Sequence, residues 1–357
     1  DYFLNWAEYL ISHVDFELVL LDVMLGFLLF AGALHTNFDQ LRVQRWPVIV
    51  FSTLGVLTST LIVSVLTYYC FGALGLNVKF IHCLLFGALI SPTDPIAVLG
   101  ILKKAGVPKK LETKIVGESL FNDGIGLVVF TTIFALAFSG ETPTFGGVAE
   151  LFLVDAVGGV LFGLVIALIS HWLIRTSHDT SIELLITLCI PTAGYALANV
   201  LGISGPLAMV VSGIFIGNVT HSKGFSESSQ TTMSHFWHTV DAFLNSLLFI
   251  LIGLLLVVLP VTWGEVGLGL LMIPAVLIAR FISVGAMYKV FRRFREYDPH
   301  SVKILTWGGL RGGLALAMAA SIPQGALMVN GADYHTVIVV VTYIVVIFSI
   351  IVQGSTI

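Results

Sequence analysis

The 357-residue sequence contains little charge: Asp, Glu, Lys and Arg together make up 11% of the chain. Soluble proteins carry about 25% charged residues. Hydrophobic residues make up 57%, and the mean hydropathy is +0.99. These values exclude a soluble globular protein, and most of the chain is expected to lie in a lipid bilayer.

Cysteine is scarce as well, and the basic residues occur in short clusters between apolar segments. Cys70, Cys83 and Cys189 fall inside apolar segments, so they are expected to be small core residues and not a disulfide or metal framework. The formal net charge is -4, and no basic stripe is interleaved with aromatic residues, which excludes nucleic acid as a partner. Neither a Gly-x-Ser-x-Gly elbow nor a His-Glu-x-x-His pair supports an intramembrane hydrolase, and no enzyme is expected.

Long apolar segments are abundant. A helix that crosses the roughly 30 Å hydrocarbon core needs about 20 residues, because it rises about 1.5 Å per residue. Eleven segments are candidates, separated by short polar or Gly/Pro-rich stretches. They are residues 17–34, 47–71, 78–102, 114–138, 147–174, 182–201, 205–219, 236–259, 266–290, 303–320 and 335–353.

The positions of lysine and arginine predict an orientation. Eleven alternating spans divide the connecting loops into two sets, and cytoplasmic loops collect positive charge. One set holds Lys79 alone, so the chain is expected to start outside and to end in the cytoplasm. The other set holds Arg42, Arg45, Lys103, Lys104, Lys109, Lys110, Lys114, Arg175, Lys223, Lys289, Arg292, Arg293, Arg295 and Lys303.

Two of the apolar segments are interrupted, and each interruption carries a charge. Residues 91–95 (Ser-Pro-Thr-Asp-Pro) contain two prolines, which remove backbone donors and turn the chain away from helix. Residues 308–313 (Gly-Gly-Leu-Arg-Gly-Gly) place four glycines around one cation, which weakens helix there. Irregular backbone is tolerated at membrane depth only inside protein or beside an aqueous cavity, so both breaks are expected in the interior.

Each interrupted segment is the middle of a triplet. The first triplet runs from residue 47 to residue 138, and the second runs from residue 266 to residue 353. The predicted orientation makes the two triplets inverted copies of each other. Inverted repeats with broken central helices indicate a secondary transporter whose site lies near the bilayer midplane.

The segment that follows the first break carries several polar residues. Ser119 and Asp123 share one helix face, as do Glu118 and Asn122, because residues four apart lie together on a helix. Charge in a membrane helix is costly and marks function. Asp123 is expected to hold either a proton or a small hard cation, but hardly both, which is what exchange requires. Glu118 is expected to be neutralised by Arg280, whose guanidinium suits a buried bidentate pair.

The sequence allows two interpretations for each of three residues in the breaks, Asp94, Arg311 and Thr93. Asp94 would either stabilise exposed amides at the start of the half-helix or contact the ion or proton directly. Arg311 would neutralise carbonyl groups exposed by the unwound backbone of its own segment, 303–320, or act in transport itself. Thr93 would either bond local backbone or contribute to the site.

Three motifs occur in a fixed order: SPTDP (91–95), GESLFNDG (117–124) and GGLRGG (308–313). Together they resemble the NhaP-type monovalent cation/proton antiporters, the bacterial relatives of the animal sodium/proton exchangers. The resemblance covers essentially the whole chain. It implies an all-α polytopic membrane protein with an inverted-repeat antiporter fold, two broken crossing helices and no cofactor.

The resemblance also implies a domain organisation and a site. Such proteins are homodimers in which a six-helix core (47–146 and 260–357) moves as an elevator against a dimerisation domain (1–46 and 147–259). Na+ would bind at Asp123, Ser119 and Thr93, and Asn122 would be held by Glu118 and Thr93. The site residues implied are Asp123, Asn122, Ser119, Thr93 and Asp94 for the ion or proton, with Glu118, Arg280 and Arg311 as charge-compensating residues.

The sequence departs from the family in two places. Family members generally have thirteen spans, so two amino-terminal helices would precede the eleven seen here. Some members carry a carboxylate in a stretch like LLFEGAL, where this chain has Ala31, so no fourth protein ligand is expected there. Asn122 followed by Asp123 resembles the electroneutral branch, in which one cation exchanges for one proton.

The expected function is therefore exchange of Na+ or Li+ for H+ across the plasma membrane, the inner membrane of a bacterium, in the service of pH homeostasis. K+/H+ exchange is the alternative within transport, because oxygen ligands without distances do not define a cation's size. A passive cation channel is the alternative from another class. Flux without obligatory proton counter-movement would distinguish it.

Overall fold

The computed structural model describes residues 18–94, 109–138, 145–177, 179–258, 261–291, 301–323, 325, 327–329 and 332–356. Helix occupies at least part of each of the eleven segments predicted from the sequence. Besides helices, the described residues contain one short pair of strands, in which β1 (Met328–Val329) pairs antiparallel with β2 (Ala332–Asp333). The predicted all-helical class is confirmed.

Several of these helices have the length and composition of membrane spans. Two shorter apolar helices, Leu18–Leu34 and Phe80–Ile90, accompany them. Because so many apolar helices are present, the chain is a multi-pass membrane protein. Within the described residues, seven helices are long and apolar enough to cross a membrane: Arg45–Ala73, Ile115–Phe138, Gly146–Thr176, Thr180–Val200, Ser228–Leu254, Trp263–Val290 and His335–Thr356.

The described residues form two compact units. Unit 1 takes its described residues from Arg45–Pro143 and Ile252–Ile357, and unit 2 consists of Leu18–Gln44 and Thr144–Leu251. Each unit is assembled from two separate stretches of sequence, and the chain passes from one unit to the other near residues 44, 144 and 251.

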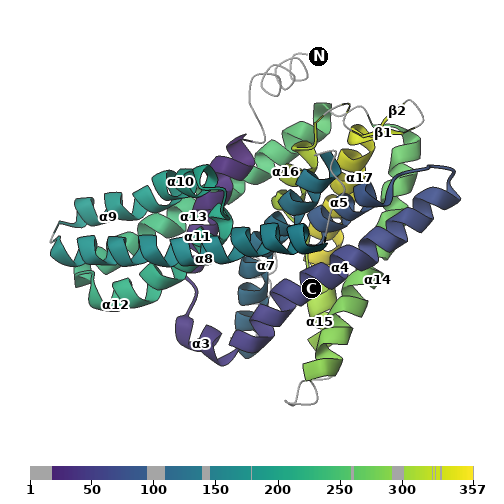
Figure 1. Ribbon diagram of the computed structural model, residues 1–357. Coiled ribbons are helices and arrows are strands. Elements are labelled where there is room, and N and C mark those ends of the chain that lie inside the picture. The colour runs from purple at the N-terminus through teal and green to yellow at the C-terminus, as the bar shows by residue number, and fades with distance from the viewer. Residues whose placement is uncertain are drawn as a thin grey trace. The chain divides into compact units, whose positions relative to one another are not determined.

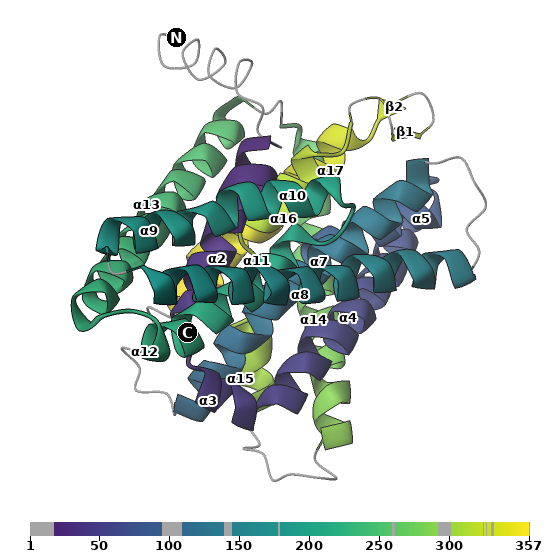
Figure 2. The ribbon, with the colours of Figure 1, turned by 60° about the vertical axis from the view of Figure 1, so that its left-hand side comes forward.

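Unit 2 is built around α11 (Gly205–Phe215), which packs against α2 and α8 (Figure 2). Glycine makes this approach possible, since a Cβ atom on Gly163 of α8 would lie 2.5 Å from the carbonyl oxygen of Ala208. The other elements of this unit are η1 (Leu18–Met24), α2 (Leu25–Leu34), α3 (Phe38–Val43), α8 (Phe145–Thr176), α9 (Thr180–Cys189), η2 (Ile190–Gly194), α10 (Tyr195–Val200), η3 (Ile216–Thr220), α12 (His221–Lys223) and most of α13 (Glu227–Val258).

Unit 1 contains both triplets. In the first, α4 (Arg45–Ala73) packs against α5 (Phe80–Ile90) and α7 (Lys109–Phe138). In the second, α14 (Trp263–Phe291) packs against α17 (His335–Phe348), and α15 (Ser301–Trp307) and α16 (Gly313–Ala320) are the halves of the broken helix. Helix α4 also packs on α14, and α16 on α5 (Figure 1). The chain continues from α17 into η4 (Ser349–Gln353) and α18 (Gly354–Thr356).

An apolar cluster ties these helices together beside the second break. Leu310, inside the break, is fully buried in it, and full burial of a leucine side chain is worth about 1.5–3 kcal/mol. The unwound backbone is therefore anchored by packing as well as by hydrogen bonds. The cluster consists of Phe51, Ile115, Val284, Tyr288, Leu305 and Leu310.

Candidate ion-binding site

The first break lies where α5 ends at Ile90, as the sequence predicted, and the structure describes it as far as Asp94. The remainder of the predicted segment 78–102, from Pro95 on, is outside the described residues. At the end of the helix the Ser91 hydroxyl donates to the Gly87 carbonyl at 2.7 Å, and Ser91 Oγ lies 3.0 Å from Ser59 Oγ. Pro92 packs against Gly126 of α7 so closely that a Cβ atom at Gly126 would collide with the proline ring.

The second break lies between Trp307 and Gly313, and it crosses the first. The amide of Asp94 donates to the Leu310 carbonyl at 2.8 Å. Arg311 Nη1 donates to the carbonyls of Ser91 at 2.5 Å and Pro92 at 2.8 Å. Backbone groups that lose their helical partners at one break are thus satisfied by the other break, as buried polar groups require.

Arg311 is the cation of this crossing. Its side chain is 2% exposed, so the guanidinium is withdrawn from water, and two carbonyl oxygens from the end of the first half-helix accept its hydrogen bonds. Carbonyl groups at a helix end carry partial negative charge. The sequence interpretation gave Arg311 the carbonyls of its own interrupted segment, whereas the carbonyls that it bonds belong to the first break.

Thr93, Asn122 and Ser119 form a closed hydrogen-bond network. The Thr93 amide donates to Asn122 Oδ1 at 3.3 Å, and Asn122 Nδ2 donates to Thr93 Oγ1 at 2.8 Å. Thr93 Oγ1 lies 3.2 Å from Ser119 Oγ. All three side chains are buried. The network joins the first break to α7 at the turn that carries Asp123.

Asp123 follows Asn122 on α7 and lies one turn after Ser119. Its side chain is half-buried, and it forms no ion pair with any side chain that the structure describes. Asp94 brings a second carboxylate to the crossing of the two breaks, where its amide donates to the Leu310 carbonyl. Carboxylate oxygens are ligands that hard cations prefer, and negative charge is costly at membrane depth, so uptake of a monovalent cation or a proton is favourable here.

Glu118 and Arg280 are brought together as a buried ion pair. Arg280 Nη2 lies 2.5 Å from Glu118 Oε1, and the side chains are 4% and 1% exposed. One oxygen makes this contact, and Glu118 Oε2 and Arg280 Nε have no partner among the described residues. Of the two partners that the family resemblance implied for Asn122, Thr93 accepts from Asn122 Nδ2, whereas Glu118 Oε2 has no hydrogen-bond partner among the described residues.

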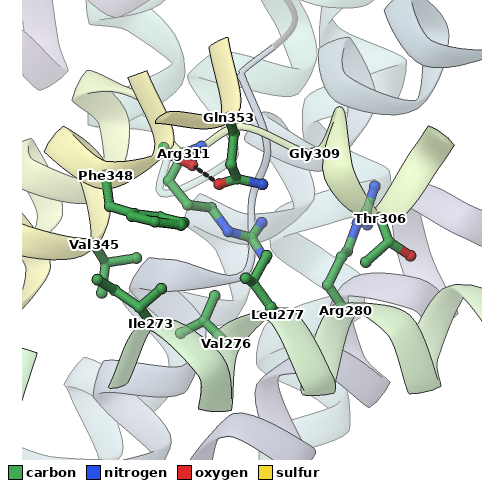
Figure 3. Close-up of a pocket in the computed structure, with 11 residues that line it drawn as sticks. Ile273, Val276, Leu277, Arg280, Thr306, Gly309, Arg311, Val345, Phe348 and Gln353 are labelled. Atoms are coloured by element: carbon green, nitrogen blue, oxygen red, sulfur yellow. Dashed lines mark hydrogen bonds between the residues drawn. The ribbon is translucent and has the colours of Figure 1, made fainter. Parts of the chain in front are cut away.

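A small cavity lies between the two arginines. Arg280 and Thr306 border it on one side and Arg311 and Gln353 on the other, with apolar side chains of α14 below them and those of α17 beside Arg311 (Figure 3). The space open to the centre of a water molecule is about 10 Å³, close to what one water needs.

Two polar residues of this region were missed by the sequence interpretation. Ser349 and Gln353, both in η4, contact the second break. Two polar residues four apart in the otherwise apolar segment 335–353 were the available signal, since polar side chains in a membrane helix are rarely accidental.

Spanning helices with two interrupted helices that cross over buried charges define a secondary membrane transporter. The sequence profile described as "Sodium/hydrogen exchanger, transmembrane" matches residues 2–357. The chain therefore belongs to the sodium/hydrogen exchanger family, which is a family of transporters and not of enzymes.

Several known proteins are similar to this chain over most of their length. The Na(+)/H(+) antiporter NhaP of Pseudomonas aeruginosa is 45% identical over 352 residues, covering 98% of this chain and 81% of that protein. The Na(+)/H(+) antiporter NhaH of Halobacillus aidingensis is 34% identical over 361 residues, covering 99% and 85%. The structure of the sodium proton antiporter MjNhaP1 from Methanocaldococcus jannaschii matches with a TM-score of 0.76 at 18% identity, covering 93% of this chain and 82% of that one.

Proposed function

We propose that this protein is a secondary antiporter that exchanges Na+ or Li+ for H+ at Asp123. One observation carries the proposal: Asp123 is the carboxylate at the crossing of two broken helices that has no cationic partner among the described residues. Ser119, one turn before Asp123 on α7, and Thr93, whose hydroxyl lies 3.2 Å from that of Ser119, supply neutral oxygens. Relatives that are named Na(+)/H(+) antiporters support the choice of Na+.

Charge balance supports exchange of one ion for one proton. Glu118 and Arg280 cancel each other. The remaining charged residues of the two breaks and of the Asn122–Asp123 turn are Arg311, Asp94 and Asp123, whose charges sum to one negative charge in a region where charge is costly. A single Na+ or a single proton neutralises it, so both loaded forms carry the same charge and the exchange is electroneutral.

The two units have separate roles in this proposal. Unit 1 holds every proposed ion ligand and is the moving core, whereas unit 2 is the dimerisation domain. Only 17% of the apolar membrane-spanning part of α8 is buried within the chain. Its exposed apolar side chains therefore support the dimerisation role of unit 2. The protein would act as a homodimer in the plasma membrane, with its carboxy-terminus in the cytoplasm.

Proton flux in sealed proteoliposomes tests the exchange. A pulse of external Na+ or Li+ is expected to make the lumen alkaline, and Asp123→Asn is expected to abolish this response. Asp39→Asn, an exposed carboxylate on α3, is the matched control and should transport normally. Full activity of Asp123→Asn would overturn the assignment, and cation flux without proton movement would indicate a channel.

Ion competition and clamping of the membrane potential test the finer claims. A response to K+ that equals the response to Na+ would favour K+/H+ exchange. If the rate is independent of an imposed potential, the exchange is electroneutral.

Spin labels at exposed Tyr69 of unit 1 and Leu161 of unit 2 should report two populated distances if unit 1 moves as an elevator. Light scattering of the detergent complex should report the mass of two chains.

A further inference from the structure

The last helix of unit 1 places two polar side chains beside the second break. Ser349 and Gln353 are both buried, and Val345 and Phe348 line the same cavity (Figure 3). A polar side chain in such surroundings is costly unless it is hydrogen-bonded. What these two side chains bond is therefore informative.

The bonds form a relay between the two ends of the break. The Arg311 amide donates to Ser349 Oγ at 3.1 Å. The Ser349 hydroxyl donates to Gln353 Oε1 at 2.5 Å, and Gln353 Nε2 donates to the Trp307 carbonyl at 2.8 Å. The relay begins on the amide of residue 311 and ends on the carbonyl of residue 307.

These are the two groups that would bond each other in a continuous helix. An α-helix pairs the amide of each residue with the carbonyl four positions earlier, so the Arg311 amide and the Trp307 carbonyl are one missing helical bond. Ser349 and Gln353 are inserted in place of that bond. The relay satisfies the Arg311 amide and the Trp307 carbonyl while the intervening glycines stay unwound. Rewinding the helix would therefore add no net hydrogen bond for these two groups.

Holding this segment open has a consequence for the ion site. Arg311 reaches the carbonyls of Ser91 and Pro92 only from its place in the unwound segment. Pro92 precedes Thr93, which bonds Asn122 and Ser119. A rewound turn would rotate Arg311 away from the first break and would free the backbone that orients Thr93.

We propose that Ser349 and Gln353 are positioning residues that keep the second break unwound and so hold the first break in its ion-binding geometry. Neither residue touches the ion. This inference rests on the proposed antiport function for its transport consequence, whereas the relay itself can be tested independently of transport.

Substitutions that remove the relay without changing its volume test the transport consequence. Ser349→Ala and Gln353→Met should each raise the apparent KM for Na+ at least fivefold, with less than a twofold change in maximal rate. Ser349→Thr keeps the hydroxyl and should restore the KM. Thr342→Val is the control, because Thr342 is a buried hydroxyl on the same helix that bonds only the Ile338 carbonyl of its own helix.

Hydrogen–deuterium exchange of the amides of residues 308–312 tests the relay directly. Exchange should be at least tenfold faster in Ser349→Ala and Gln353→Met than in the parent protein, and unchanged in Thr342→Val. Unchanged exchange in folded variants would overturn the relay, and faster exchange with an unchanged KM would overturn the positioning role. If the parent protein shows no Na+/H+ exchange, the proposed function fails while the amide measurement still decides the relay.

Discussion

The carboxylate of Asp94 occupies the space that a Cβ atom on Gly312 would need. Gly312 directly precedes α16, so a negative charge from the first break lies at the amino-terminal end of the second broken helix. Negative charge is favourable there because helix amides point outwards at that end. One of the two interpretations from the sequence placed Asp94 at a half-helix start, and among the described residues the half-helix start that it meets belongs to the other triplet.

A methyl group at position 312 is expected to separate Asp94 from α16. Gly312→Ala should destabilise the protein by about 1–3 kcal/mol, the usual cost of overpacking, and should lower Na+-driven proton flux at least tenfold. Thermal unfolding in detergent and flux in proteoliposomes measure these effects. Gly285→Ala is the control, since no atom lies within 4 Å of its added Cβ, and equal behaviour of the two variants would refute the close contact.

Loss of one partner of the Glu118–Arg280 ion pair should destabilise the protein more than loss of both partners. Glu118→Gln leaves a buried guanidinium without its counter-charge and should cost about 3–5 kcal/mol of stability. The double variant Glu118→Leu/Arg280→Met removes both charges and should recover most of that loss. Thermal unfolding of the three proteins measures the coupling, and additive losses in the double variant would contradict it.

Arg311→Lys should not conserve function. Arginine binds the carbonyls of Ser91 and Pro92 together, whereas an ammonium group is a point donor on a flexible stem. We expect at least a tenfold lower rate of Na+-driven proton flux with normal expression and a near-normal unfolding temperature. A lysine variant at parental rate would show that charge alone is sufficient.

Thr93→Val should weaken Na+ binding. The change keeps the shape of the side chain and removes the hydroxyl that accepts from Asn122 Nδ2, which costs about 1–3 kcal/mol for a buried group. The apparent KM for Na+ should rise roughly 5- to 100-fold. Thr67→Val is the matched control, because the Thr67 hydroxyl bonds only the Val63 carbonyl of its own helix, and its KM should match that of the parent protein.

Proton competition should set the pH dependence of transport. If one carboxylate, Asp123, binds either ion, protonation removes the Na+ site, and the apparent KM for Na+ should rise about tenfold per pH unit on the acid side of the transition. The maximal rate at saturating Na+ should change much less. Initial rates measured over a matrix of pH and Na+ concentration report this, and a KM independent of pH would exclude a shared site.

Local features of the sequence were sufficient to predict the helices and the positions at which two of them break. Apolar segments long enough to span a bilayer have few alternatives to helix, because every backbone group must be satisfied within the segment. Pro92 lacks an amide donor, and the glycines at 308–313 weaken helix at their own positions. The structure accordingly ends α5 at Ile90 and α15 at Trp307. The ion-binding roles of Asp123 and Ser119 remain predictions from sequence, now with a described geometry.

Local patterns in the sequence are sufficient to define a helical membrane protein, its helical segments and the positions of the two breaks, because hydropathy, proline and glycine act over a few neighbouring residues. The groups that satisfy the broken ends, in contrast, are set by tertiary packing. Arg311 bonds carbonyls some 220 residues away, Asp94 meets the opposite half-helix, and Ser349 with Gln353 replaces one missing helical bond. Such partners depend on how the two triplets pack, and no local pattern encodes that packing.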